Sequence, residues 1–283
     1  MKLDDLFKSG SSIPSLPQVY FKFKDAVADP DTTFEELASV LECDPGLTVQ
    51  LLKIVNSPFF GFSNQVETVP HAISILGNNQ INELVLSACV LDRFKNISPE
   101  IIDMQLFWEH SIACGLAAKI MSQHFNNVNA DSIFVAGLLH DIGRLIICTN
   151  TPSLFSEIFL KGQNEKISLL KAEKSILGFG HDEVGGELMK RWKLPKIHEE
   201  SVRYHHTPAK SPSFKKEAAT INIANSIAQN LLLGSSGELL DSKIKKESLE
   251  ILDIKPGETF LKIREEVQEQ YQNTVQTFLQ TSS

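Results

Sequence analysis

Apolar residues recur along this chain at intervals of three and four, which places them on one face of an α-helix. Leu47, Leu51, Ile54 and Val55 follow this spacing directly after Asp44-Pro45. An aspartate at the N-cap and a proline at the first helical position are typical of a helix start. The pattern therefore predicts a helix over residues 45–55.

The same signals mark helices through most of the chain. Thr33 and Glu36 are spaced as a capping box, and Pro208 ends the helix before it. No alternation of apolar and polar residues runs longer than four positions, so the predicted fold class is all-α. We predict helices at about 18–28, 33–41, 45–55, 69–76, 80–94, 101–125, 131–150, 153–161, 168–176, 181–192, 196–206, 218–233 and 256–279.

Ser98-Pro99 is a natural boundary between two parts of different character. Residues 1–97 read as a compact helical module with one histidine and no glycine-rich phosphate loop. Residues 98–283 carry the remaining histidines and most of the candidate chemistry. We therefore expect a helical N-terminal module at 1–97 and a second helical domain at 98–283.

Charge and composition exclude some function classes. The net charge is −8 and the pI is about 5.5, which argues against a nucleic-acid partner. No apolar run reaches the ~18 residues that span a bilayer, and acids stand where a signal peptide has basic residues, so we expect no membrane contact. The cysteines show no CxxC spacing and indicate reduced thiols in a cytoplasmic protein: Cys43, Cys89, Cys114 and Cys148.

His140 and Asp141 stand side by side after an apolar run, with Gly137 before them and Gly143 after them. Burying either side chain without a partner costs roughly 1–3 kcal/mol. A divalent cation that binds both would remove this cost, since imidazole and carboxylate are good ligands for first-row metals. The alternative is that Asp141 caps a helix or forms an ion pair while His140 bonds to the backbone.

Further polar residues in the second half strengthen the metal interpretation. They lie on different predicted helices or near helix ends, so their side chains can converge from several elements: His110, His140, Asp141, His181, His205 and His206. Arg144 follows Asp141 by three residues and could contact a phosphate. We interpret His71, His124 and His198 as ordinary core or surface residues.

These residues resemble a known family. Leu139-His140-Asp141-Ile142-Gly143 looks like the signature of the HD superfamily of metal-dependent phosphohydrolases. The whole chain resembles more closely the HDOD domain, an HD-related output domain of bacterial signalling. The matching segments are Leu16-Pro17, Asp44-Pro45-Gly46-Leu47, Asn56-Ser57, Ile75-Leu76-Gly77, Gly137 to Gly143, His181 with Val184-Gly185, Trp192 with Leu194-Pro195, and His205-His206. The resemblance implies an N-terminal helical module packed on an HD-type helical bundle.

The resemblance also implies a set of metal ligands. Compared with the related HD-GYP phosphodiesterases, the matching positions are His110, His140, Asp141, His181, His205 and His206, with Asn225 in place of a final aspartate. The GYP segment is replaced by Thr207-Pro208-Ala209, Leu106 stands where a bridging acid would be expected, and Arg144 replaces a frequent lysine. The expected cofactor is a divalent metal: iron, manganese or zinc.

Two functions remain open at this point. One is a signalling output domain that acts through protein partners such as a kinase, a receiver domain or components of a cyclic-dinucleotide pathway, with a partly retained metal site. The other is a metal-dependent phosphohydrolase acting on a phosphoester or a nucleotide, including a cyclic dinucleotide, with His140, Asp141 and Arg144 as catalytic residues. A third interpretation is an adaptor that binds nucleic acid or a receptor domain. The negative charge argues against the nucleic-acid partner.

Overall fold

The computed structural model describes residues 1–8, 15–94, 102–125, 128–238, 243–255 and 257–279. The chain divides into two compact units. The large unit comprises Met1–Pro14 and Asn96–Gln268, and the small unit comprises Ser15–Lys95 and Glu269–Ser283. All elements in the described ranges are helical, so the all-α prediction is confirmed.

The small unit contains α1 (Gln18–Ala28), α2 (Phe34–Glu42), α3 (Pro45–Val55), α4 (Val69–Arg93) and the last part of α14 (Glu258–Leu279). Both predicted caps are present. Thr33 forms a capping box with Glu36, and the Asp44 carboxylate accepts the Leu47 N–H at 3.1 Å. Gly77, with φ 78°, interrupts α4 where the sequence predicted a helix end.

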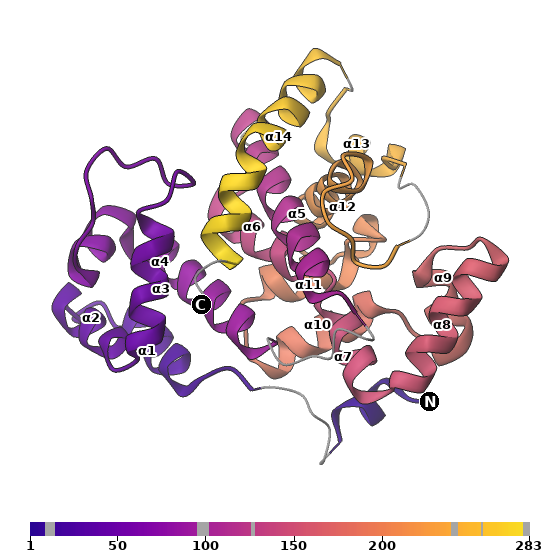
Figure 1. Ribbon diagram of the computed structural model, residues 1–283, viewed down its shortest axis with the longest axis horizontal. Helices are drawn as coiled ribbons and strands as arrows, with labels where there is room; N and C mark the ends of the chain where they lie inside the picture. Colours follow the sequence, from indigo (N-terminus) through magenta and orange to yellow (C-terminus); the bar gives the residue numbers. More distant parts are fainter. Residues whose placement is uncertain (9–14, 95–101, 126–127, 239–242, 256, 280–283) are drawn as a thin grey trace. The chain divides into compact units, whose positions relative to one another are not determined.

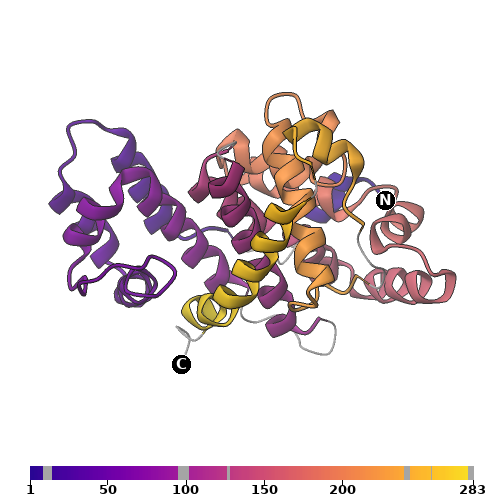
Figure 2. The same ribbon diagram turned by 90° about the horizontal axis from the view of Figure 1, so that it is seen from above.

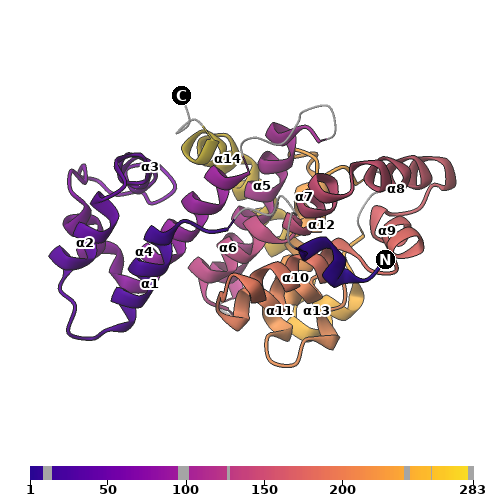
Figure 3. The same cartoon turned by 90° about the horizontal axis from the view of Figure 1, so that it is seen from below.

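The large unit is built mainly on α5 (Met104–Phe125), which packs against α6 (Ala130–Leu139) and α12 (Lys215–Asn230) (Figures 1 and 2). α8 (Pro152–Glu165) and α9 (Leu169–Leu177) pack together, and η1 (Leu3–Phe7) contacts α7 (Ile142–Asn150) (Figure 3). The remaining elements of this unit are α10 (His181–Arg191), α11 (Lys196–Tyr204), η2 (Pro208–Lys210), α13 (Lys246–Leu252) and the first part of α14. The sequence did not predict α13, η1 or η2.

The single helix predicted over 131–150 is wrong, because the structure divides it into α6 and α7. His140 caps the end of α6, and Asp141, with φ −99° and ψ 6°, leaves helical geometry before α7 begins. Each helix keeps a regular apolar pattern up to the break, so the sequence spacing does not reveal it. The break lies at the two residues singled out for their chemistry.

The stretch Ala130–Asn150 is, contrary to expectation, long and apolar enough to cross a membrane, with a mean hydropathy of 1.5. However, 89% of it is buried inside the protein. The helix break at Asp141 also interrupts it. Packing in the core of the large unit accounts for its composition.

Close backbone contacts between helices hold the elements that carry the polar residues. A Cβ atom added at Gly137 would lie 2.7 Å from the Gly115 Cα, so α5 and α6 touch with no side chain between them. A Cβ atom at Gly143 would overlap the His181 carbonyl oxygen, so α7 meets the start of α10 equally closely. These contacts bring His110, the 140–141 break and His181 to one place.

Candidate metal centre

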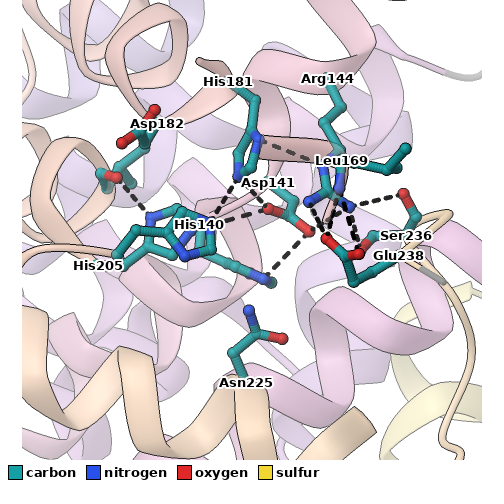
Figure 4. Close-up of polar contacts among 12 residues, drawn as sticks. His140, Asp141, Arg144, Leu169, His181, Asp182, His205, Asn225, Ser236 and Glu238 are labelled. Carbon is teal, nitrogen blue, oxygen red and sulfur yellow. Dashed lines mark hydrogen bonds and ion pairs between the residues drawn. The ribbon is translucent and has the colours of Figure 1, made fainter. Parts of the chain in front are cut away.

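The structure brings all the sequence-predicted metal ligands together inside the large unit. Figure 4 labels His140, Asp141, His181, His205 and Asn225 of this cluster. They come from α5, the α6–α7 break, the start of α10, the end of α11 and the middle of α12: His110, His140, Asp141, His181, His205, His206 and Asn225. Four of them, His140, Asp141, His181 and His205, have no exposed surface. The cluster is therefore a buried polar centre in an apolar core.

The first ligand group joins Asp141 to three imidazoles. The potential ligand atoms of Asp141, His181, His205 and His206 all lie within 4.8 Å of one another. Asp141 Oδ1 is 3.0 Å from His181 Nε2 and 3.9 Å from His205 Nε2. His206 Nε2 lies 3.0 Å from His181 Nε2. A metal ion could use these four atoms together.

The second ligand group shares Asp141 with the first. It contains His110, His140 and Asp141, again with potential ligand atoms within 4.8 Å of one another. Asp141 Oδ2 lies 3.3 Å from His140 Nε2. Asn225 completes this side, with its Oδ1 at 3.1 Å from His110 Nε2. Asp141 thus directs Oδ1 toward the first ligand group and Oδ2 toward the second.

Three imidazoles are oriented by an acceptor behind the ring. His140 Nδ1 lies 2.7 Å from the Gly137 carbonyl oxygen, and His205 Nδ1 lies 2.7 Å from the Val202 carbonyl oxygen. Because a carbonyl oxygen only accepts, each Nδ1 donates, so the neutral form of each ring has its lone pair on Nε2. These Nε2 atoms and both Asp141 oxygens are buried without a hydrogen-bond partner.

Glu173 on α9 holds the third imidazole in the same way. Its Oε2 accepts hydrogen bonds from the backbone N–H of His181 at 2.8 Å and from His181 Nδ1 at 2.7 Å. The carboxylate is only 1% exposed. A carboxylate behind a histidine fixes its tautomer and makes it a better metal ligand. The sequence analysis missed Glu173, and no motif around it marks the residue.

Arg144 is buried next to the two ligand groups. Its Nη1 lies 3.3 Å from Asp141 Oδ2 and donates to Ser236, at 2.9 Å to the carbonyl oxygen and at 2.7 Å to Oγ. Its other nitrogens lie 3.7 Å from Glu173 and 3.6 Å from Glu238. Burial opposes ionisation of Asp141, but the Arg144 guanidinium together with His140 and His181 keeps the pKa of that carboxyl well below its usual range.

Ser236 and Glu238, which bind Arg144, are further residues of the site that no sequence motif indicated. They follow Gly234 in the segment after α12. Glu238 also accepts the Leu169 N–H at the start of α9. A glycine-rich segment gives no sequence signal for an arginine partner 92 residues earlier in the chain.

Burial and charge affect the imidazoles of the cluster differently. Burial lowers the pKa of His110 to about 4 and the pKa values of His205 and His206 well below their usual range. Burial also opposes the charged form of His181, but the Glu173 and Asp141 carboxylates together outweigh it and raise the pKa of His181 to about 9. Neutral imidazoles are the form that binds metal. Three of the rings are therefore already in the ligand form near neutral pH.

The alternative interpretation of the His140-Asp141 pair is also visible in part. His140 does bond to backbone, and Asp141 does pair with Arg144. Neither contact accounts for the inward Nε2 atom of His140 or for Asp141 Oδ1. Buried polar atoms without partners are rare in folded proteins and call for an explanation. The donor set, imidazole nitrogen with carboxylate oxygen, fits a divalent first-row metal.

The three other histidines lie outside the two ligand groups. His124 Nε2 lies 2.8 Å from a Glu266 carboxylate oxygen, with its side chain 26% exposed. His71 is exposed on α4, and His198 is buried on α11. Neither ligand group among the described residues includes any of the three.

Comparison with known proteins agrees with this fold. Residues 13–208 match the HDOD domain, so the chain belongs to the HDOD family. A curated relative, an uncharacterised protein of Treponema pallidum (strain Nichols), is 26% identical over 216 residues, which is 75% of this chain. The match covers 41% of the length of that relative.

Solved structures share the fold over nearly the full chain. An HDOD domain protein of unknown function from Geobacter sulfurreducens superimposes with a TM-score of 0.80 at 24% identity, covering 99% of this chain and 97% of the other. A Shewanella amazonensis SB2B protein, provisionally named a phosphohydrolase, gives 0.77 at 20% identity and covers 98% of both. A protein of Marinobacter aquaeolei VT8, provisionally named a signal transduction protein, gives 0.72 at 20% identity, covering 100% of this chain and 62% of the other.

Proposed function

We propose that this chain is a bacterial, cytoplasmic signal-transduction output domain that holds a divalent metal in its buried His/Asp cluster and acts through protein partners. The partners we expect are a kinase, a receiver domain or a component of a cyclic-dinucleotide pathway. HDOD membership and neighbours named for signal transduction support the signalling context. The observation that carries the metal site is the buried Asp141 carboxylate beside the inward Nε2 atom of His205, none of which has a hydrogen-bond partner.

The ligands of the metal are the converging imidazoles and Asp141. Iron, manganese and zinc all accept this mixture of nitrogen and oxygen donors. A bound dication neutralises the buried Asp141 carboxylate and gives partners to the Nε2 atoms that lack them. In the absence of metal, those desolvated atoms destabilise the folded state. The metal therefore stabilises the helical core of the large unit.

Burial favours a regulatory role over turnover. His140, Asp141, His181 and His205 have no exposed surface, and Arg144 is 1% exposed. A phosphoester could touch these groups only after the surrounding helices moved apart. Asn225 in place of an acid also leaves one negative charge fewer for holding metals. The centre is better suited to stabilising a conformation that a partner recognises.

A metal-dependent phosphohydrolase is the second candidate. One observation favours it: Asp141 is shared by two ligand groups, the arrangement found in two-metal hydrolytic sites. A bound metal would supply Lewis acidity toward the phosphorus of a phosphoester or nucleotide. His206, which is only part-buried, would lie on the side open to substrate.

Metal analysis and a turnover assay together test both candidates. We would purify the wild type, His140→Ala/Asp141→Ala and the control His71→Ala, and measure iron, manganese and zinc by elemental analysis. We expect metal in the wild type and the control and none in the double variant. A metal-free wild type that is as stable as the double variant contradicts the proposed centre. If the wild type hydrolyses bis(p-nitrophenyl) phosphate and the double variant does not, the phosphohydrolase function is supported in place of the regulatory one.

A further inference from the structure

We propose that the centre binds one divalent ion and that the Arg144 guanidinium takes the electrostatic place of a second. The ion is held by the first ligand group: Asp141, His181, His205 and His206. The second group, with His110, His140 and Asn225, stays free of metal. This inference rests on the proposed function, because it concerns the number and position of ions in the proposed centre.

The spacing of the first group suits one tetrahedral ion. Ligand atoms about 2.1 Å from a tetrahedral metal lie about 3.4 Å from one another. In this group Asp141 Oδ1 lies 3.0 Å from His181 Nε2 and 3.9 Å from His205 Nε2, and the His181 and His206 Nε2 atoms are 3.0 Å apart, so the separations scatter around that value. His206 Nε2 and His181 Nε2 face each other directly, and one cation between them would use both lone pairs. Three nitrogens and one carboxylate oxygen complete the four positions.

The second group lacks the charge that a further dication requires. Its fourth member is Asn225, an uncharged amide, and the Asn225 Oδ1 lies 3.1 Å from His110 Nε2. With the amide oxygen as acceptor, His110 Nε2 donates to Asn225, so this nitrogen has no lone pair for a metal and only Nδ1 of the ring keeps one. Asp141 Oδ2 is then the only anionic oxygen in the group, and Arg144 Nη1 already lies 3.3 Å from it.

Arg144 is fixed in this position from the other side. Ser236 accepts two hydrogen bonds from Nη1, and Glu238 lies 3.6 Å from Nη2 (Figure 4). The segment that carries both residues is itself pressed onto α5. A Cβ atom at Gly234 would overlap the His110 backbone nitrogen, and the Ser235 N–H donates to the Leu106 carbonyl oxygen at 2.9 Å. The guanidinium therefore cannot withdraw without moving this segment.

A second dication would lie beside the Arg144 guanidinium. Asp141, Glu173 and Glu238 surround Arg144, so three carboxylates face one guanidinium. The positive charge of Arg144 is therefore already held at Asp141, the carboxylate that a second ion would have to share with the first. Like charges that close repel strongly in a low-dielectric interior.

Metal stoichiometry in paired variants tests the inference. We would load the full chain with zinc, and separately with cobalt(II), remove excess metal, and count equivalents by elemental analysis. The key pair is His206→Ala from the first group and His110→Ala from the second, with His124→Ala as the control. We expect one equivalent in the wild type, His110→Ala and the control, and at least tenfold weaker binding in His206→Ala. Cobalt(II) in the wild type should give the intense visible bands of a tetrahedral site.

A gain of metal tests the role of Arg144 directly. The double variant Arg144→Gln/Asn225→Asp removes the guanidinium and restores a carboxylate, so we expect a second equivalent. Circular dichroism checks that the double variant folds. Asn225→Asp alone keeps Arg144 and should bind one equivalent, and this variant provides the test if the double variant does not fold.

The outcomes separate this inference from the proposed function. A wild type that binds neither zinc nor cobalt contradicts the proposed centre itself. Two equivalents in the wild type, loss of the ion in His110→Ala, or unchanged affinity in His206→Ala would overturn the single-ion inference and leave a metal centre in place. A second equivalent in Asn225→Asp alone would overturn the role given to Arg144.

Discussion

Glu173 Oε2 accepts two hydrogen bonds from His181, one from its backbone N–H and one from its ring Nδ1. A single carboxylate oxygen thereby fixes both the start of α10 and the orientation of the imidazole. The pair connects α9, which carries no recognisable metal-site motif, to the ligand cluster. This contact leads to the first prediction.

Glu173→Gln should weaken metal binding about 10–100-fold, the usual cost of losing a partner behind a ligating histidine. The amide keeps the shape of the side chain but removes the charge that makes His181 a stronger ligand. Competition with a zinc-binding dye measures the affinity. Glu165→Gln, at an exposed position on α8, is the matched control and should bind as the wild type does. Equal affinity in both variants would show that Glu173 does not support the ligand.

Gly137→Ala should destabilise the large unit by about 1–3 kcal/mol, the typical cost of overpacking a core. The new methyl group would lie 2.7 Å from the Gly115 Cα, and backbone atoms cannot move aside as a side chain can. Gly46→Ala is the control, because its Cβ would meet only Asp44 Oδ1 at 3.4 Å and alanine favours the helix. Urea unfolding should show opposite changes in the two variants. A stable Gly137→Ala would mean that α5 and α6 can separate freely.

Lys119 should make stability depend on pH between about 8 and 10.5. Burial lowers the pKa of Lys119 to about 8, and the attraction of Asp131 offsets only part of that effect. In this window the unfolded chain binds the proton and the folded chain does not, so stability rises with pH. Below pH 8 both states are protonated, and the cost of the buried charge is fully present.

Lys119→Met should therefore be more stable than the wild type by about 1–3 kcal/mol at pH 7, and the difference should shrink as the pH approaches 10.5. Denaturant unfolding at several pH values measures it. Lys262→Met, at an exposed position on α14, should show no such trend. A difference independent of pH would assign the gain to apolar packing alone.

Metal addition should raise the unfolding temperature. A ligand that binds only the folded state at 100 times its dissociation constant stabilises it by about 2.7 kcal/mol. We expect this increase for zinc with the wild type, its reversal by EDTA, and no response in His140→Ala/Asp141→Ala. Differential scanning fluorimetry on the same preparations would record it. An equal increase in the double variant would place the zinc elsewhere on the chain.

Local signals predicted most of the helices because the capping residues act on their own neighbours. Thr33, Glu36 and Asp44 form the contacts that their spacing indicated. The break at Asp141 escaped prediction because it depends on packing against α10 through Gly143, a contact distant in sequence. Apolar periodicity on both sides of it continues without a marker.

The ligand residues could be proposed from the HDOD resemblance, and the structure places all of them in one cluster. The groups that support them could not be proposed. Glu173, Ser236 and Glu238 act through tertiary contacts, and a lone acid or serine in a polar segment carries no motif. Metal ligands belong to a few residue types that can be recognised in a sequence, whereas the residues that orient those ligands form almost no recognisable motif.

The contact between Gly115 and Gly137 has a consequence for how the centre tolerates change. Because main chain meets main chain there, the distance between α5 and α6 does not depend on the size of any side chain at the crossing. Substitutions that enlarge or shrink apolar residues elsewhere in the large unit can be absorbed by rotamer shifts without altering this separation. The distance between His110 and His140 is thus set by the backbone. The apolar residues of the surrounding core can therefore change while the ligands keep their positions.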